Sequence, residues 1–216
     1  GTNVHPLHRW DRNSDKIQFY TPQNSSIAQA APTAFANDSG GNLWIGLYDN
    51  GVARYRDGHF TRFTEKDGLP ANFVRDMLID SKKRLWIATN GGVSRVDDPL
   101  ADRPQFRNYT SNDGLASNQV TTVIEDRWGQ IYLGTGRGLD RLDPDSGKIK
   151  HYTTADGLSD NFINVSMRDS QGALWFGTYR GLSRFRPEQD KPLSPPPIII
   201  SGLRVIREGL KPEDWV

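Results

Sequence analysis

The residues that could do chemistry in this chain are few and scattered. The four histidines, His5, His8, His59 and His151, occupy unrelated positions, and only His5 and His8 lie close together, in a segment without helical pattern. The sequence contains no cysteine, which excludes thiolate nucleophiles, disulfides and Cys-based zinc sites. We therefore expect no catalytic residue, no metal site and no cofactor.

Other residues with catalytic potential recur in a way that favours a structural role. Aspartates appear once in each of several similar segments, at Asp67, Asp113 and Asp156 and again at Asp80, Asp126 and Asp169. Such regular recurrence beside glycine is typical of turns. The glycine-rich run at residues 134–138 has the composition of a phosphate loop, but no helical pattern follows it. No serine lies in a nucleophile elbow.

Side chains suited to binding a polar ligand occur in four short segments that each follow a Leu-Trp-Ile-Gly-like run. The candidate ligand-binding residues are Tyr48, Asp49, Asn50, Asn90, Arg137, Tyr179 and Arg180. A tyrosine ring can stack on a sugar, and the polar side chains can form hydrogen bonds with its hydroxyl groups. The residue types differ between segments, as expected of ligand contacts. The alternative is a set of solvated turn residues.

An internal repeat positions these segments. A motif of the form apolar-aromatic-apolar-small begins at Leu43, Leu85, Ile131 and Leu174, at intervals of 42, 46 and 43 residues. Each copy is followed by Gly-apolar-x-Arg, and Asp-Gly-Leu recurs at the three aspartates Asp67, Asp113 and Asp156. A longer loop at residues 98–104 accounts for the 46-residue interval. So many matched positions in one register indicate a tandem repeat.

Each repeat has the pattern of four short strands. In the second copy these are residues 73–80, 85–89, 92–96 and 106–110, which are rich in β-branched and aromatic residues and bounded by turn residues. Four strands in roughly 43 residues predict an all-β fold, a β-propeller with four recognisable blades. The tryptophan would fill the wedge between blades, and the small residue two positions later would allow close packing.

The crossover between blades is predicted at Asp-Gly-Leu. Glycine supplies the left-handed backbone conformation, aspartate bonds nearby backbone N–H groups, and leucine enters the interblade core. An asparagine follows three residues after each leucine, at Asn72, Asn118 and Asn161, where we expect a structural hydrogen bond at the start of the first strand.

The chain divides into repeats and a tail. We place a partial blade at residues 1–21, repeats at about 22–64, 65–110, 111–153 and 154–190, a Pro-rich linker at 191–197, and the first strand of a truncated following domain at 198–216. The N-terminal strands could complete the last blade and close a four-bladed ring. We favour a partial propeller whose open edges are covered by other blades or by a second chain, which suggests a homo-oligomer.

The repeat resembles the two-component regulator propeller, the repeat of the periplasmic sensor region of bacterial hybrid histidine kinases and diguanylate cyclases. The resemblance is carried by DGLxxN and LWIGTxxGLxR, matches closely at residues 121–143 and 161–185, and departs at residues 21–26, where Asp-Gly-Leu is missing. The tail at residues 195–205 resembles the start of an Ig-like triple-tyrosine domain. The resemblance implies a periplasmic location, in the sensor part of an inner-membrane receptor.

The leading hypothesis for function is thus a non-catalytic sensor propeller that binds a small molecule or oligosaccharide. The alternatives are a propeller enzyme similar to streptogramin lyases, suggested by the Asp-Pro-x-x-Gly element at residues 143–147, and a propeller that serves only receptor assembly. A net charge of +1 gives no reason to expect a nucleic-acid partner, and no apolar run is long enough for membrane contact within this segment.

Overall fold

The computed structural model describes residues 7–21, 25–27 and 30–189. The predicted linker at 191–197 and the predicted strand at 198–216 lie outside the described residues. The described chain is built from antiparallel β-sheets and three single-turn 3-10 helices. The prediction of an all-β propeller architecture is confirmed.

The sheets follow one another along the chain. A hairpin of β1 (His8–Asp11) and β2 (Lys16–Phe19) comes first. Three four-stranded blades follow. The first contains β3 (Pro32–Asn37), β4 (Leu43–Leu47), β5 (Val52–Arg56) and β6 (His59–Phe63). The second contains β7 (Val74–Ile79), β8 (Leu85–Thr89), β9 (Gly92–Val96) and β10 (Arg107–Tyr109). The third contains β11 (Val120–Glu125), β12 (Ile131–Thr135), β13 (Gly138–Leu142) and β14 (Ile149–Tyr152). A fourth blade has three described strands, β15 (Ile163–Arg168), β16 (Leu174–Thr178) and β17 (Gly181–Phe185).

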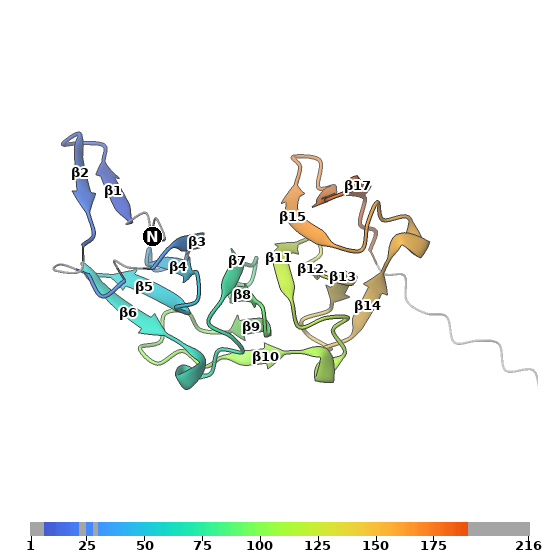
Figure 1. Ribbon diagram of the computed structural model, residues 1–216, viewed down its shortest axis with the longest axis horizontal. Helices are drawn as coiled ribbons and strands as arrows, with labels where there is room; N and C mark the ends of the chain where they lie inside the picture. The colour runs from blue at the N-terminus through green and yellow to red at the C-terminus, as the bar shows by residue number, and fades with distance from the viewer. Residues whose placement is uncertain (1–6, 22–24, 28–29, 190–216) are drawn as a thin grey trace, which may run out of the picture.

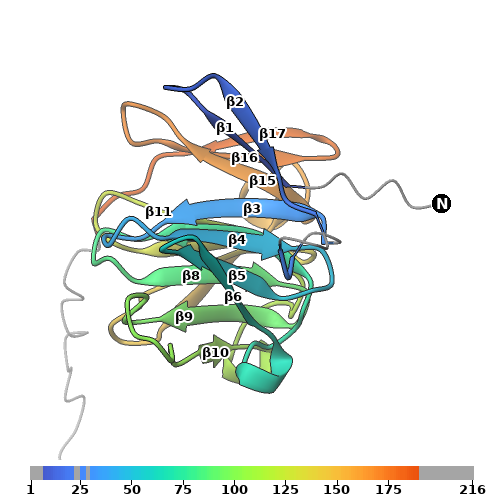
Figure 2. The same cartoon turned by 90° about the vertical axis from the view of Figure 1, so that its left-hand side faces the viewer.

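The blades are arranged as an open arc. The first strands β3, β7, β11 and β15 contact one another in succession on the inner side of the arc. Figure 1 shows the β1–β2 hairpin at one end of this arc and the fourth blade at the other, with the side view in Figure 2. The hairpin forms its own two-stranded sheet, and the described strands of the fourth blade form another. The described residues therefore do not form the four-bladed ring in which the N-terminal strands complete the last blade.

Aromatic residues of the second strands hold neighbouring blades together. Trp44 and Trp86 are fully buried, and each stacks on an outer-strand ring of its own blade, Phe63 and Tyr109, with centroids 5.7 and 5.9 Å apart. Trp44 shares a core with Val74 and other residues of the next blade. Such burial contributes roughly 1.5–3 kcal/mol for each large apolar side chain, so the rings stabilise the blade interfaces together with the aliphatic residues around them.

The small residue after each tryptophan is required by the same interface. A Cβ on Gly46 would lie 2.6 Å from Val74 Cγ1, and a Cβ on Gly134 would lie 2.7 Å from Ile163 Cγ2. Both neighbours belong to the next blade. The prediction that this position allows close packing between blades is confirmed at these two sites.

The repeated arginine and aspartate have structural partners. Arg54 lies with its guanidinium 5.4 Å from the Trp44 ring centroid and donates to Ala101 O, in the loop of the next blade, at 2.6 Å. Asp80 accepts hydrogen bonds from the Trp86 indole N–H at 2.8 Å and from the backbone N–H of Arg84 at 2.9 Å. The aspartate thus joins the hairpin turn to the core ring, which supports the interpretation as turn chemistry.

Each of the three Asp-Gly-Leu crossovers contains a 3-10 turn that the sequence pattern did not predict. These turns are η1 (Glu65–Asp67), η2 (Ser111–Asp113) and η3 (Thr154–Asp156), and in each one a Thr and an Asp form a capping box. The following Gly68 has φ 110°, and Leu69 is 4% exposed in the core between blades. Asn72 Oδ1 accepts from the backbone N–H of Glu65 at 3.0 Å. The expected roles of the glycine, the leucine and the asparagine are confirmed.

Candidate functional site

The candidate ligand-binding residues lie at one end of the blades. Strand direction alternates within a blade, so the turns between second and third strands share an end with the crossovers that lead into the first strands. Hydrogen bonds join the two sets: Gly51 N donates to Asn72 O at 2.8 Å, and Asn90 N donates to Phe73 O at 3.2 Å. We call this end of the arc the turn face.

On the turn face, the first two blades form a group of four side chains that includes two of the predicted residues, Tyr48 and Asn90. Tyr48 is 54% exposed and its ring centroid lies 4.3 Å from that of Phe73. The Arg75 guanidinium lies over the Phe73 ring, 4.4 Å from its centroid, and Arg75 Nε donates to Asn90 Oδ1 at 3.0 Å. We call Tyr48, Phe73, Arg75 and Asn90 the Tyr48 cluster. It presents an exposed aromatic ring beside a cation and an amide.

The fourth blade presents a second group on the same end. Tyr179 is 77% exposed, and its ring centroid is 5.4 Å from that of Phe162. Arg180 Nε lies 3.7 Å from Asp160 Oδ2, with the arginine side chain 82% exposed. Exposed ion pairs of this kind contribute little to stability. The Tyr179 and Arg180 side chains are therefore both available to a ligand.

The remaining predicted residues serve the turns themselves or stand apart. Asp49 has a left-handed backbone with φ 57°, and Asn50 Nδ2 donates to Tyr48 O at 3.2 Å, so both shape the longer turn that projects Tyr48. Arg137 is exposed in the third blade, and its backbone N–H is held by Thr135 Oγ1 at 3.0 Å. Tyr48 is connected to Asn90 through Phe73 and Arg75. Tyr179 and Arg180 share the fourth-blade group, and Arg137 belongs to neither group.

Four residues of these groups were missed from the sequence, namely Phe73, Arg75, Phe162 and Asp160. Phe73 and Phe162 each follow the asparagine of the crossover motif, where the third blade has Gln119, and the half-buried Arg75 is the second residue of β7. These positions vary between repeats just as the turn residues do. The criterion of non-repeated residues would have found Phe73 and Phe162 if it had been applied to the residue before each first strand.

The described residues offer no group of three or more His, Asp or Glu placed to hold a metal ion. His151 Nδ1 lies 2.6 Å from Asp140 Oδ1, a carboxylate that also accepts from Ala116 N at 2.9 Å. Burial raises the pKa of Asp140, and the His151 contact opposes that shift. Asp140 thus joins β13 to both β14, through His151, and the crossover into the third blade, through Ala116. No helix within the described part of the chain is long and apolar enough to cross a membrane.

The repeats match a known family. The family described as two component regulator propeller matches residues 68–91, 114–137 and 157–180, which are the three crossovers and the first strands, second strands and turns that follow them. The sequence matches none of the curated proteins.

Solved structures share the fold at low sequence identity. The extracellular domain assigned to the hybrid two component system BT3049 from B. thetaiotaomicron is 21% identical, with a TM-score of 0.74, over 85% of this chain and 28% of that one. Selenomethionine-substituted virginiamycin B lyase from Staphylococcus aureus is 15% identical, with a TM-score of 0.61, over 87% of this chain and 64% of that one. The chain therefore spans less than two thirds of either protein, and both likenesses show the fold alone.

The fold and the interblade contacts define this chain as a partial β-propeller. Three of its repeats match the family described as two component regulator propeller.

Proposed function

We propose that this propeller is the non-catalytic, ligand-sensing part of an extracytoplasmic receptor of the two-component type, and that the turn face binds a polar ligand such as an oligosaccharide. The family of the repeats and the extracellular domain of a hybrid two component system with the same fold support the receptor class. The periplasm is the compartment we propose for it.

The observation that carries the ligand class is the Tyr48 cluster. The exposed Tyr48 ring, tilted against Phe73, offers an apolar surface. Arg75 over the Phe73 ring, bonded to Asn90, adds hydrogen-bonding groups to the same cluster. Sugars present one apolar face and several hydroxyl groups, which this combination suits. Framework residues such as Trp86 and Asp80 are occupied within the blade, so recognition belongs to the residues that differ between blades.

The test is a thermal-shift screen with neutral and acidic oligosaccharides of two to six sugars. A ligand that binds only the folded chain raises its stability by RT ln(1 + [L]/Kd), about 2.7 kcal/mol at a hundredfold excess over Kd. We expect a hit whose shift is lost in Tyr48→Ala and in Arg75→Gln. The matched control is Trp10→Ala, which removes a ring that is similarly exposed, at 58%, on the β1–β2 hairpin.

Tyr179→Ala and Arg180→Ala separate the two groups on the turn face, because they remove the fourth-blade group and leave the Tyr48 cluster intact. If binding is lost in Tyr179→Ala and Arg180→Ala but kept in Tyr48→Ala and Arg75→Gln, the ligand binds on the fourth blade. A hit that survives all four substitutions contradicts the proposal, and so does metal-dependent turnover of the ligand by the isolated chain.

A further inference from the structure

Arg75 is held at the turn face by two contacts that leave its outer nitrogens available. Its Nε donates to Asn90 Oδ1 at 3.0 Å, and its guanidinium lies over the Phe73 ring, 4.4 Å from the centroid. Within the described part of the chain, Nη1 and Nη2 of Arg75 have no hydrogen-bond partner. These two atoms carry most of the N–H donors of an arginine, in a fixed planar fork. Arg75 therefore presents a preoriented set of donors to a ligand that binds beside Tyr48.

The turn face carries cations that its own carboxylates do not neutralise. Among the described residues, no ion pair joins Arg75 or Arg137 to a carboxylate. Asp160 is paired with Arg180 at 3.7 Å, and the crossover aspartates are bound in capping boxes. Asp49 is the only carboxylate in the described turns between second and third strands, and it has no ion pair either. Two unpaired cations thus stand against one unpaired carboxylate.

Amide groups accompany these two cations. Asn90 bonds to Arg75, and Gln119 stands in the third crossover, where its backbone oxygen accepts from Gly136 N at 3.3 Å. A Cβ on Gly136 would lie 3.0 Å from Gln119 Oε1 and 3.7 Å from Phe162 Cε2, so the glycine leaves both groups uncovered by a turn side chain. From the first blade to the fourth, a ligand on the turn face would meet an aromatic ring, a cation, two amides and a second ring.

This arrangement suits a negatively charged ligand better than a neutral one. A guanidinium has donors and no acceptor, and it stays protonated. A carboxylate or a sulfate accepts two parallel hydrogen bonds from its fork, and such charge-assisted bonds are roughly twice as strong as neutral ones. Because Asn90 and Phe73 already hold Arg75, little side-chain freedom is lost when the ligand binds. A neutral sugar would leave the charge without a counter-ion.

We propose that the ligand of the turn face is an acidic oligosaccharide, and that Arg75 binds one of its oxyanions, a carboxylate or a sulfate, through Nη1 and Nη2. The sugar ring next to that oxyanion stacks on Tyr48, and the amides of Asn90 and Gln119 bind hydroxyl groups. Arg137 meets a second acidic group further along the ligand. This inference rests on the proposed function and adds the charge of the ligand and the residues that recognise it.

The test compares matched pairs of tetrasaccharides by isothermal titration. One pair is a uronic-acid tetrasaccharide and its methyl ester, and the other is a sulfated tetrasaccharide and its desulfated form. We expect the acidic member of at least one pair to bind about tenfold more tightly than its neutral counterpart, as a charge-assisted hydrogen bond predicts. The pair that shows this difference identifies the oxyanion as a carboxylate or a sulfate. Its affinity should fall as the salt concentration rises.

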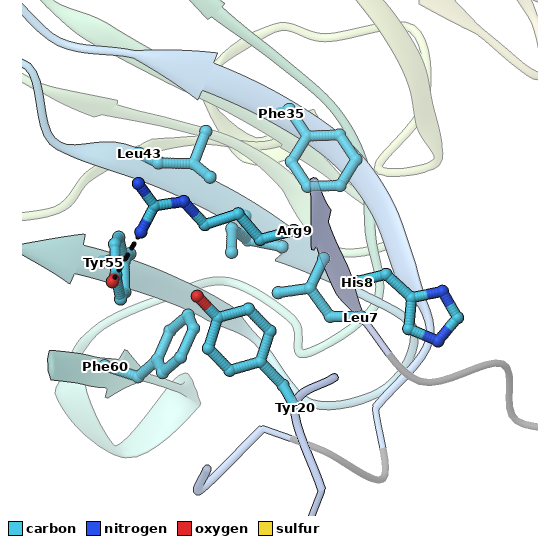
Figure 3. A pocket seen from close by; sticks show the side chains of 9 residues that line it. Leu7, His8, Arg9, Tyr20, Phe35, Leu43, Tyr55 and Phe60 are labelled. Carbon is cyan, nitrogen blue, oxygen red and sulfur yellow. Dashed lines mark hydrogen bonds between the residues drawn. The ribbon is translucent and has the colours of Figure 1, made fainter. Parts of the chain in front are cut away.

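Arg75→Gln should remove the preference for the acidic member and leave the affinity for the neutral member nearly unchanged. Arg75→Lys keeps the charge without the fork and should give an intermediate loss. Arg9→Gln is the matched control, because Arg9 also lies beside aromatic rings but on the β1–β2 hairpin, where its Nη1 donates to the Tyr55 hydroxyl at 3.5 Å (Figure 3). The unfolding temperature of each variant without ligand verifies that the variant folds.

Two results would overturn the inference and leave the proposed function standing if Tyr48→Ala still abolished binding. These are equal binding of both members of each pair, and an equal loss for both members on Arg75→Gln. Arg9→Gln that weakens binding as much as Arg75→Gln would also overturn the inference, because the effect would then reflect total charge. Absence of binding by all four compounds up to about 1 mM would overturn it as well, and would overturn the proposed function too unless a neutral oligosaccharide gives a hit in the thermal-shift screen.

Discussion

Replacing Asp80 by alanine tests how much the repeated aspartate contributes to a complete blade. The Asp80 side chain is fully buried and accepts three hydrogen bonds, from Arg84 N at 2.9 Å, Arg84 Nε at 2.6 Å and the Trp86 indole at 2.8 Å. Its removal leaves the indole N–H buried without an acceptor, which costs about 1–3 kcal/mol, and the guanidinium without its carboxylate, which costs about 3–5 kcal/mol when a pair is fully buried.

The two costs do not add, because one carboxylate serves both donors and because Arg84 also lies 3.7 Å from Asp145. We therefore expect Asp80→Ala to lower the free energy of unfolding by about 3 kcal/mol, a large part of the roughly 5–15 kcal/mol typical of a domain. Urea denaturation with a shared m-value measures this loss.

Asp169→Ala provides the matched control in the fourth blade. Asp169 accepts the same indole hydrogen bond, from Trp175 at 2.9 Å, but Ala173 stands at the position of Arg84 and the Trp175 ring is only half-buried. The arginine beside Asp169 is Arg184, at 3.7 Å and with its side chain 35% exposed. Water can replace the lost acceptor there, so the loss should be clearly smaller than for Asp80→Ala. Equal losses in the two variants, or a loss below about 1 kcal/mol for Asp80→Ala, would refute the reasoning.

The other predictions concern glycines and one carboxyl group. Gly134→Ala should destabilise by about 1–3 kcal/mol through overpacking, because its Cβ would lie 2.7 Å from Ile163 Cγ2; an unchanged Tm would contradict the close packing. Gly157→Ala meets no atom within 4 Å but has φ 101°, so a loss of about 1 kcal/mol should come from backbone strain alone. The Trp175 indole is the largest cause that lowers the pKa of Asp169 below 3.8, so Trp175→Phe should raise that pKa in an NMR titration. A lowered pKa stabilises the fold above pH 3.8, and this contribution is lost as the pH falls through the folded-state pKa. If the difference in free energy of unfolding between Trp175→Phe and the parent chain stays constant as the pH falls from above 3.8 through the folded-state pKa, the link is disproved.

The framework was predictable from the sequence because each framework residue recurs. Trp86, Gly68 and Asp80 stand in equivalent places in several blades, so spacing alone indicated the strands, the crossover and the turn. Their partners confirm these roles: the indole bonds to the aspartate, and the glycine has φ 110°.

Features without a repeat were harder to predict. The first crossover lacks Asp-Gly-Leu, yet Ile27 is 2% exposed in the core beside the first blade and takes the place of the leucine. The 3-10 turns were missed because three residues are too few for a helical pattern, although the Thr-x-x-Asp capping box signals them. Arg75 was missed because its contact with Asn90 joins a strand to a turn 15 positions away.

The most direct test of the central claim is hydrogen–deuterium exchange of the chain with and without a saturating oligosaccharide from the thermal-shift screen. If recognition lies on the turn face, amides at residues 48–51, 73–75 and 90–91 should exchange more slowly in the complex. The turns at the opposite end of the blades, at residues 81–83 and 127–129, should be unchanged. Protection confined to those opposite turns would contradict the account.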